Sequence, residues 1–474
     1  MKKLIILVFV FGITITKSSS QTSQEYFDKG NSKFKLKDYS GAISDYNKAI
    51  EINPKYDEAF YFRGLAKFYI KDFYGAILDY SKVIEMNPKH EKSFYNRGLT
   101  KANLKDFTGA ILDYNQVIEI NPKYEKAFNN RGIAKKNIQD FNGAILDYNK
   151  AIEINPKSAD AFYNRGNAKY NLKDFDGAIS DYTNTIEINP EYADAYYNRG
   201  LAKADLKDFD GAILDYIKTI QINPTHDKAF NNRGLAKANL KSFYDAILDY
   251  DRAIEINPEN VDAYYNRGLA KYYFKEINGA ILDYNKTIGI NPKHDKAFYN
   301  RGLAKAKLKD FNGAILDYNN AIEINPKYDK AFNDRAIAKA NLKDFNGAIS
   351  DYNKAIEINP KYADVFYNKG NARYSLKDFN GAILDFTKAI EINPKDIDAF
   401  YNRGLAKYTL EDYNGAIFDY TKVIEINPND ADAFYKRGMA KIKINQKESG
   451  CIDLKKAKEL GSIEAIEGVK KYCN

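Results

Sequence analysis

The chain has 474 residues, 44% of them apolar and 29% charged, so it is long and apolar enough to bury a large core. Its formal net charge is +8, and the basic side chains recur along the whole sequence. A nucleic-acid-binding protein would usually gather its basic residues in one patch or tail, so we expect no nucleic-acid partner.

Residues 1–20 have the pattern of a secretory signal peptide. Lys2 and Lys3 form a basic start, the run from Leu4 to Ile15 is apolar, and three serines precede a plausible cleavage site before Gln21. The apolar run is too short to cross a bilayer, which takes roughly 18–20 residues. We therefore expect no transmembrane span and an exported protein that is periplasmic, at the cell surface or extracellular. An uncleaved N-terminal anchor is the alternative.

The twelve prolines of the chain follow one another at a spacing of 34 residues, from Pro54 to Pro428. A fixed period of this size indicates one supersecondary unit that is copied and stacked many times. With proline at position 32 of each repeat, residues 23–464 form thirteen repeats, the last of which is degenerate. Residues 465–474 complete a C-terminal helix.

Each repeat contains two helical patterns, over about positions 2–14 and 18–30, in which apolar and small residues recur three and four apart. A Lys-Asp-Phe-x-Gly stretch separates the two patterns in most repeats. Asn-Pro ends the second one, because proline lacks the amide that would continue a helix. The expected fold class is all-α: an α-solenoid superhelix of stacked helix-turn-helix hairpins with a C-terminal capping helix.

The repeat resembles the tetratricopeptide repeat (TPR) family, in its secreted bacterial type, over residues 23–464. The matching features are aromatic residues at positions 4, 17 and 24, small residues at positions 8 and 20, and proline at position 32. Glycine at position 8 and alanine at position 20 are interpreted as the point where the two helices approach closely, with the aromatic rings filling the remaining gaps. The resemblance implies a non-catalytic scaffold that binds a protein or peptide along its concave face.

Two positions depart from the family pattern. Position 7, usually leucine in the family, is Arg or Lys in all thirteen repeats, and position 23 is Asp in all thirteen. Antiparallel packing of the hairpin places these positions opposite each other, which predicts an ion pair in each repeat because a partly buried charge needs a partner. The predicted pairs include Arg97 with Asp113 and Arg301 with Asp317. A ladder of cations for an anionic ligand is the alternative.

The C-terminal repeat lacks its proline and carries Gly461-Ser462 in its place, which predicts a last short helix over about Ile463 to Tyr472. Antiparallel packing around Ser462 would bring Cys451 opposite Cys473. In an oxidising compartment we expect these cysteines to form a disulfide that holds the capping helix. Two buried free thiols are the alternative.

The sequence offers no catalytic or metal-binding constellation. The three histidines, His90, His226 and His294, all occupy position 34, two or more repeats apart, so they cannot converge on a metal ion or a nucleophile. The glycines recur singly, so they form no phosphate-binding loop. We expect no enzyme activity, no cofactor and no metal.

The resemblance to TPR proteins places the ligand groove on positions 2, 5, 6, 9, 12 and 13 of each first helix. Position 5 is mostly Tyr and position 6 mostly Asn, which favours amide hydrogen bonds and rigid aromatic contacts with an extended peptide. The candidate groove residues are Tyr61, Tyr95, Asn96, Asn130, Tyr163, Asn164, Tyr170, Tyr197, Asn198, Asn232, Tyr265, Asn266, Tyr272, Tyr299, Asn300, Tyr367, Asn368, Tyr374, Tyr401 and Asn402. An ordinary solvated helix surface is the alternative. No repeat has Lys at position 5, so a lysine clamp for a C-terminal carboxylate is not supported.

The variable positions carry a second period of three repeats. Aromatic residues stand at position 12 in Phe68, Tyr170, Tyr272 and Tyr374, and the same repeats have an acid at position 2. This pattern is either the trace of a duplicated block or a groove with repeating pockets for a repetitive ligand. We expect a protein-interaction scaffold. The alternatives are a polyanion or glycan binder that uses the basic residues at position 11, such as Lys67, and a spacer without a ligand.

Overall fold

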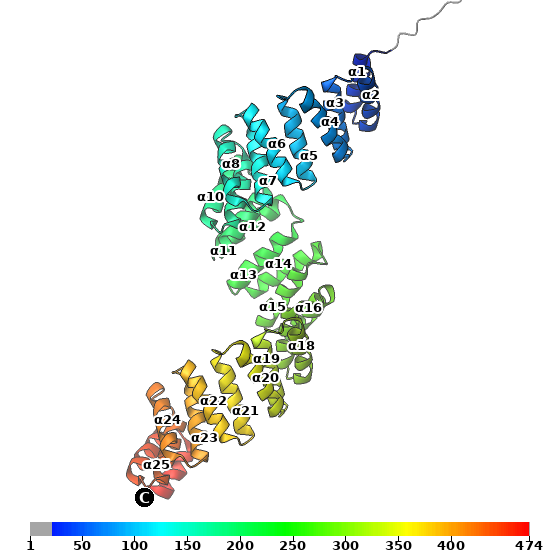
Figure 1. Cartoon of the computed structure of the whole chain (residues 1–474). Coiled ribbons are helices and arrows are strands. Elements are labelled where there is room, and N and C mark those ends of the chain that lie inside the picture. Colours follow the sequence, from blue (N-terminus) through cyan, green and yellow to red (C-terminus); the bar gives the residue numbers. More distant parts are fainter. Residues whose placement is uncertain (1–20, 474) are drawn as a thin grey trace, which may run out of the picture. The chain divides into compact units, whose positions relative to one another are not determined.

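The computed structural model describes residues 21–473, which form 27 α-helices and no strand (Figure 1). The helices belong to two compact units, residues 1–224 and 225–474. The fold is an all-α array of helix hairpins, as the sequence predicted. The expected signal peptide, residues 1–20, lies outside the described residues. No helix in the described part of the chain is long and apolar enough to cross a membrane.

The first unit contains the first six hairpins. Its helices are α1 (Ser23–Lys35), α2 (Tyr39–Ile52), α3 (Asp57–Tyr69), α4 (Phe73–Met86), α5 (Glu91–Asn103), α6 (Phe107–Ile120), α7 (Glu125–Asn137), α8 (Phe141–Ile154), α9 (Ala159–Asn171), α10 (Phe175–Ile188), α11 (Ala193–Asp205) and α12 (Phe209–Ile222). Odd-numbered helices are the first helices of the repeats, and even-numbered helices are the second.

The second unit contains seven further hairpins and a last helix. Its helices are α13 (Asp227–Asn239), α14 (Phe243–Ile256), α15 (Val261–Tyr273), α16 (Ile277–Ile290), α17 (Asp295–Lys307), α18 (Phe311–Ile324), α19 (Asp329–Asn341), α20 (Phe345–Ile358), α21 (Ala363–Ser375), α22 (Phe379–Ile392), α23 (Ile397–Thr409), α24 (Tyr413–Ile426), α25 (Ala431–Lys443), α26 (Lys447–Glu459) and α27 (Ile463–Tyr472).

The hairpin turn sets where each helix ends. In repeat 3 the residue at position 15, Lys105, has φ 62°, a left-handed conformation that stops α5. The next residue, Asp106, caps α6 by accepting a hydrogen bond of 2.9 Å from the amide of Gly109. The helices in most repeats therefore cover positions 1–13 and 17–30, each beginning one residue earlier than the sequence pattern indicated.

The core of each hairpin is a close contact between position 8 and position 24. A Cβ atom added to Gly98 would lie only 2.8 Å from the ring of Tyr114, which is 1% exposed. Glycine is therefore needed so that the first helix can lie against a buried ring. The sequence analysis paired the glycine at position 8 with the alanine at position 20. In the structure the atoms nearest to Gly98 belong to the ring of Tyr114 at position 24, although Ala110 at position 20 is also fully buried.

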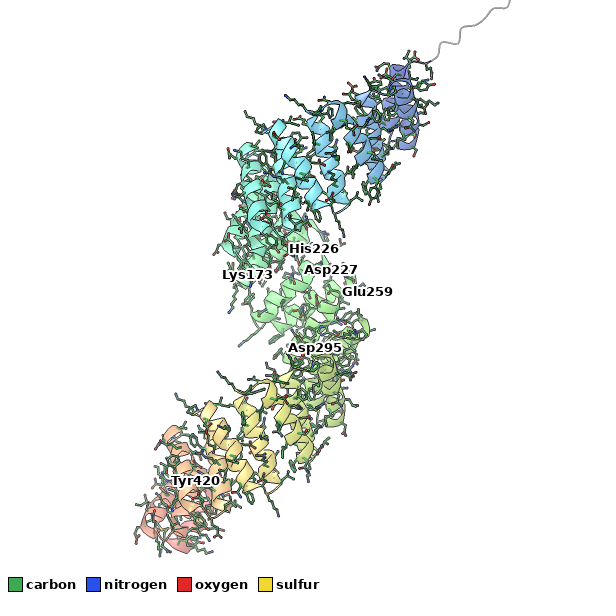
Figure 2. The ribbon with its side chains drawn as sticks, viewed as in Figure 1. Lys173, His226, Asp227, Glu259, Asp295 and Tyr420 are labelled. Carbon is green, nitrogen blue, oxygen red and sulfur yellow. A yellow bond between two sulfur atoms is a disulfide. The ribbon has the colours of Figure 1, made fainter. Side chains whose placement is uncertain are left out.

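Side chains at the start of a first helix hold the turn that ends the same repeat. Asp227, which Figure 2 labels, lies at the start of α13. Its carboxylate accepts hydrogen bonds of 3.0 Å from the side-chain amides of Asn257 and Asn260. Asp295 accepts a similar bond of 3.1 Å from Asn325. These contacts reach from the first helix of one repeat to the end of its second helix, so they orient the turn on which the next repeat begins.

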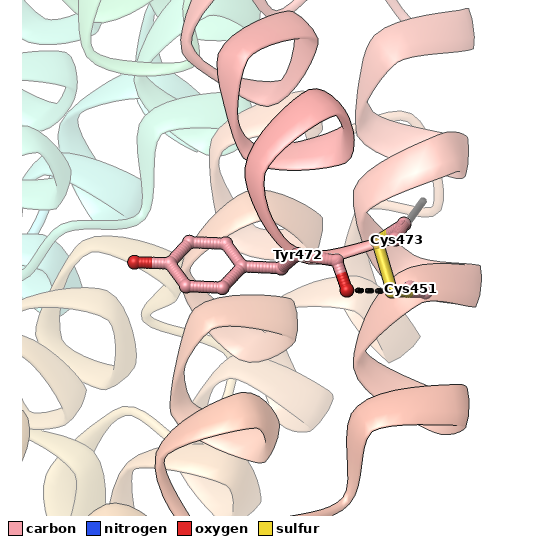
Figure 3. Close-up of a disulfide and its surroundings, with 3 residues drawn as sticks. All are labelled: Cys451, Tyr472 and Cys473. Carbon is pink, nitrogen blue, oxygen red and sulfur yellow. Dashed lines mark hydrogen bonds between the residues drawn. A yellow bond between two sulfur atoms is a disulfide. The ribbon is translucent and has the colours of Figure 1, made fainter.

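The last hairpin is closed by α27, which packs against α26 and α25. A disulfide joins Cys451 in α26 to Cys473, with the two Cα atoms 5.5 Å apart (Figure 3). The Cys451 sulfur also lies 3.6 Å from the carbonyl oxygen of Tyr472. The structure thus holds the C-terminal helix covalently over the end of the array, where no further repeat follows among the described residues.

Candidate functional site

Most of the basic residues at positions 7 and 11 of the first helices form ion pairs within their own repeats. Arg97 donates to both carboxylate oxygens of Asp113, at 2.6 Å from Nη2 and 3.1 Å from Nε, and Lys101 approaches the same carboxylate at 2.8 Å. The Asp113 side chain is only 3% exposed. Arg301 and Asp317 form the same contact. Each aspartate therefore lies between two cations that are one helical turn apart.

The lysine partner at position 11 was missed by the sequence reasoning, which paired position 23 with position 7 alone. In all thirteen repeats the basic residue at position 11 lies 2.7–3.0 Å from the aspartate. The first repeat differs from the expectation at position 7, because Lys29 lies over the Tyr26 ring and Lys33 contacts Asp45. The sequence did contain an indication of this contact, because the basic residue at position 11 recurs in all thirteen repeats, as do the basic residue at position 7 and the aspartate at position 23.

Within each unit, the arginine at position 7 also ties most repeats to the one before it. Arg131 donates through Nη1 to Asn115 of the preceding repeat at 2.7 Å, and its guanidinium lies 5.4 Å from the ring centre of Phe128. Its remaining donors bind Asp147. The cations at position 7 are therefore bound to other side chains of the protein. This disfavours the alternative in which they form a row of free cations for an anionic ligand.

The predicted groove residues at positions 5 and 6 bind one another across repeat boundaries. The amide of Asn130 donates to the Tyr95 hydroxyl at 2.8 Å, and Asn198 donates to Tyr163 at 2.9 Å. The same bond joins Asn96 to Tyr61, Asn300 to Tyr265 and Asn402 to Tyr367, at 2.9–3.0 Å. These side chains are half-buried. They form a polar ladder on the first-helix face that both fixes the stacking and offers unused amide and ring surface.

The ladder changes at every third junction. There position 5 is Asn, and the amides of Asn164, Asn266 and Asn368 donate to the preceding Asn129, Asn231 and Asn333 at 3.2–3.4 Å. Tyr299 instead donates its hydroxyl to Asp334 at 2.6 Å, because repeat 10 has Asp where the others mostly have Asn. Burial raises the pKa of Asp334 above its usual value. The three-repeat period of the sequence is thus also a period of side-chain contacts.

The remaining predicted groove residues make other contacts. The hydroxyl of Tyr170 donates to Asp205 at 2.6 Å, and the Tyr374 ring lies 5.1 Å from that of Phe379. Tyr272 lies beside Tyr273, and Tyr401 packs against the buried Tyr420. Repeat 13 has Lys436 at position 6, so Tyr401 has no asparagine of the next repeat to bind.

A groove of about 490 Å³ runs along the first-helix face of repeats 3 to 5. Its walls include Tyr95, Lys126, Asn130, Asp160 and Tyr192. Two smaller hollows, of about 350 and 250 Å³, lie nearer the hairpin turns at the junctions of repeats 4 and 5 and of repeats 10 and 11. Their lining includes residues at several of the first-helix positions named in the sequence analysis, together with residues of the second helices and the turns between repeats.

The histidines serve as helix caps. His90 and His294 accept a hydrogen bond through Nδ1 from the amides of Ser93 and Ala297, at 3.2 and 3.1 Å. Burial lowers the pKa of His90, which favours the neutral ring that can accept this bond. Within residues 21–473 there is no group of three or more His, Cys, Asp or Glu side chains that could hold a metal ion.

Profiles of the tetratricopeptide repeat family match several segments that together make up most of the chain. A profile described as TPR repeat matches residues 30–69, 135–173, 242–273, 340–376 and 370–411. Two profiles described as tetratricopeptide repeat match residues 159–192, 193–226, 295–328, 397–430 and 91–124. The chain belongs to the TPR family, whose members are in general protein-interaction scaffolds without catalytic activity.

Several solved TPR structures are similar to parts of the chain. YrrB, described as a TPR protein with an unusual peptide-binding site, is 24% identical, and the alignment covers 39% of this chain and 95% of YrrB with a TM-score of 0.36. MamA is 30% identical, with 36% and 92% covered and a TM-score of 0.34. A TPR protein from Parabacteroides merdae is 19% identical, with 52% and 98% covered and a TM-score of 0.40. No curated protein sequence matches the chain.

Proposed function

We propose that this TPR protein binds an extended segment of a partner protein along the first-helix face of its repeats. The observation that supports the proposal is the groove of about 490 Å³ whose walls come from three successive repeats, with Tyr95, Lys126 and Asp160 among them. A groove built from successive repeats suits an elongated ligand. Tyrosine and asparagine supply rigid contact area and hydrogen bonds, which suits the alternating groups of a peptide backbone.

Two observations favour a protein ligand over a polyanion. The basic residues at position 11, which a polyanion would need, each contact a buried aspartate. The groove itself carries charges of both signs, Glu125 and Asp160 beside Lys126 and Lys157. A polyanion would meet carboxylates there, whereas a peptide of mixed charge would find complementary partners.

The proposal is tested by selecting peptides from a displayed random library on the purified full-length chain. Lys126→Glu reverses an exposed charge in the groove, and Lys218→Glu makes the same change on the exposed surface of α12. Selected peptides should bind Lys126→Glu roughly tenfold more weakly, the cost of about 1.4 kcal/mol from a lost charged contact, and should bind Lys218→Glu like the unaltered chain. If the selected peptides bind both variants equally, or if no peptide is selected, the result would favour the alternative that the protein is a spacer without a ligand.

We also propose that the chain is exported and that no step of its function requires catalysis by its own residues. The basic and apolar pattern of residues 1–20 supports export, and the Cys451–Cys473 disulfide suits an oxidising compartment. N-terminal sequencing of the protein recovered from its source should find Gln21 as the first residue. A chain that begins at Met1 in the cytoplasmic fraction would refute export.

A further inference from the structure

Two hollows on the first-helix face lie close to the hairpin turns. They are six repeats apart in the sequence, and residues at the same repeat positions line both of them. Phe141, Asn167 and Asn171 line the hollow in the first unit, and Phe345, Asn371 and Ser375 line the one in the second. One of the two hollows lies in each unit of the chain. The first measures about 350 Å³ and the second about 250 Å³.

Both hollows have an asparagine at position 9, which only the first repeat, with Asn31, shares. The side-chain oxygen Oδ1 of Asn167 accepts hydrogen bonds from the Tyr182 hydroxyl at 2.8 Å and from the Asn198 side-chain amide at 3.0 Å. Asn371 accepts from Asn402 at 3.3 Å in the second pocket. Most other repeats have Leu or Ile at this position. At these two sites asparagine therefore stands where most repeats have a branched apolar side chain, and hydrogen bonds from neighbouring side chains hold the asparagine in place.

The two pockets differ in one charge. Lys136 lines the first, and Ala340 stands at the equivalent position of the second. Lys136 is the only lysine at position 12 in the thirteen repeats, and it is half-buried. The adjacent Lys135 is neutralised by Asp147 at 2.8 Å, whereas none of the described ion pairs includes Lys136.

The surroundings of Lys136 disfavour a bare ammonium group. Burial alone lowers its pKa, with no carboxylate near enough to offset the effect. A half-buried cation without a counter-ion is destabilising until an anion binds beside it.

We propose that the Lys136 pocket anchors an acidic side chain, Asp or Glu, of the extended segment that the groove binds. This inference rests on the proposed function, since it names the chemistry of one contact on the same first-helix face, in a hollow separate from the groove of repeats 3 to 5. The Lys136 ammonium would bind the carboxylate. The side-chain amides of Asn137 and Asn171 each donate one N–H to a backbone carbonyl, at 2.8 and 2.7 Å, and the second N–H of each amide would be a further donor. Phe141 and Leu201 supply apolar walls for the methylene groups. The Ala340 pocket, which has no cation, takes a neutral side chain instead.

The first test is lysine footprinting on the full-length chain. Acetylation of each lysine is followed by mass spectrometry in the presence of the blocked peptide Gly-Ser-Glu-Ser-Gly or its Gln twin. The Glu peptide should slow the modification of Lys136, and the Gln peptide should not. The exposed Lys218 serves as an internal control whose rate neither peptide changes. Equal protection by the two peptides, or no protection of Lys136, would overturn the proposal.

The second test exchanges the charge between the pockets. Lys136→Ala should weaken binding of the Glu peptide by roughly tenfold in calorimetry, the range expected for one charge-assisted contact. Ala340→Lys should create a second site for the same peptide in the second unit. Circular dichroism melting curves verify that both variants fold. Unchanged affinity in Lys136→Ala would exclude the anchor.

The outcomes separate this inference from the proposed function. If library-selected segments still require Lys126 but are indifferent to Lys136→Ala, the groove binds a segment and the acidic anchor is wrong. If selected segments ignore Lys126 while the Glu peptide still protects Lys136, the pocket is an anion site outside the proposed groove function.

Discussion

The aspartate between two cations offers the most direct test of how the repeats are held together. Asp113→Asn keeps the shape of the side chain and removes its charge, which leaves Arg97 and Lys101 without their shared partner. Removing one member of a buried ion pair costs about 3–5 kcal/mol. The Asp113 side chain is 3% exposed, but those of Arg97 and Lys101 are 18% and 20% exposed and recover some hydration. We therefore expect a loss at the low end, about 3 kcal/mol.

Hydrogen exchange followed by mass spectrometry is the suitable assay, because an array of repeats opens locally and a single unfolding midpoint would average over it. A loss of 3 kcal/mol corresponds to roughly a hundredfold drop in the protection of the α5 and α6 amides. The matched control is Glu85→Gln, which breaks the exposed Lys82–Glu85 pair of 2.7 Å and should cost less than about 0.5 kcal/mol. Equal effects of the two substitutions would show that burial of the carboxylate does not matter and would refute the reasoning.

Three further predictions concern single features. Because burial raises the pKa of Asp334, the stability that its protonated form contributes is lost as the pH rises through the folded-state pKa. Asp334→Asn should therefore melt higher than the unaltered chain at about pH 7 and lose this advantage near pH 4; a lower melting temperature at neutral pH would contradict it. Replacing Cys451 and Cys473 with serine should reduce protection of α27 by about 3 kcal/mol and leave α1 unchanged, as hydrogen exchange would measure. Burial raises the pKa of Tyr114 far above its usual value, so alkaline absorbance titration should show a set of tyrosines that ionise only when circular dichroism reports unfolding.

The spacing of the prolines was sufficient to predict the hairpins, because a residue that cannot continue a helix marks the same boundary in every repeat. The ends of the helices were less predictable. Lys105, which is not a glycine, adopts a left-handed conformation with φ 62°, and the chemistry of a lysine side chain does not predict this conformation. The turn geometry imposed by Asp106 and the packing of Tyr114 on Gly98 select that conformation.

The ion pairs were half predictable. The recurrence of Arg at position 7 and Asp at position 23 indicated a contact, since antiparallel helices place them opposite each other. The lysine at position 11 lies one turn further along the same helix face, so its partnership with the same aspartate followed from helical spacing and could have been predicted as well. Treating Lys67 as a surface cation assigned it to a ligand, whereas it contacts Asp79 at 2.8 Å.

The resemblance to TPR proteins predicted a binding face on the first helices, but it did not predict the contacts that its side chains make with one another. Asn130 and Tyr95 belong to different repeats, and their hydrogen bond depends on how far one hairpin is displaced and rotated relative to the next. No local pattern encodes that offset. For the same reason the isolated Lys136 attracted no notice until the pocket around it could be seen.

By itself the sequence determined the repeating unit, the order of its helices and which residues are buried within each hairpin, because these depend on helical periodicity and on residues that interrupt it. Tertiary structure alone decided which side chains of one repeat meet those of the next, and which cation lacks a partner. Those contacts depend on how far one hairpin is displaced and rotated relative to the next. Many residues on both packed surfaces determine this offset together, so no single residue predicts it.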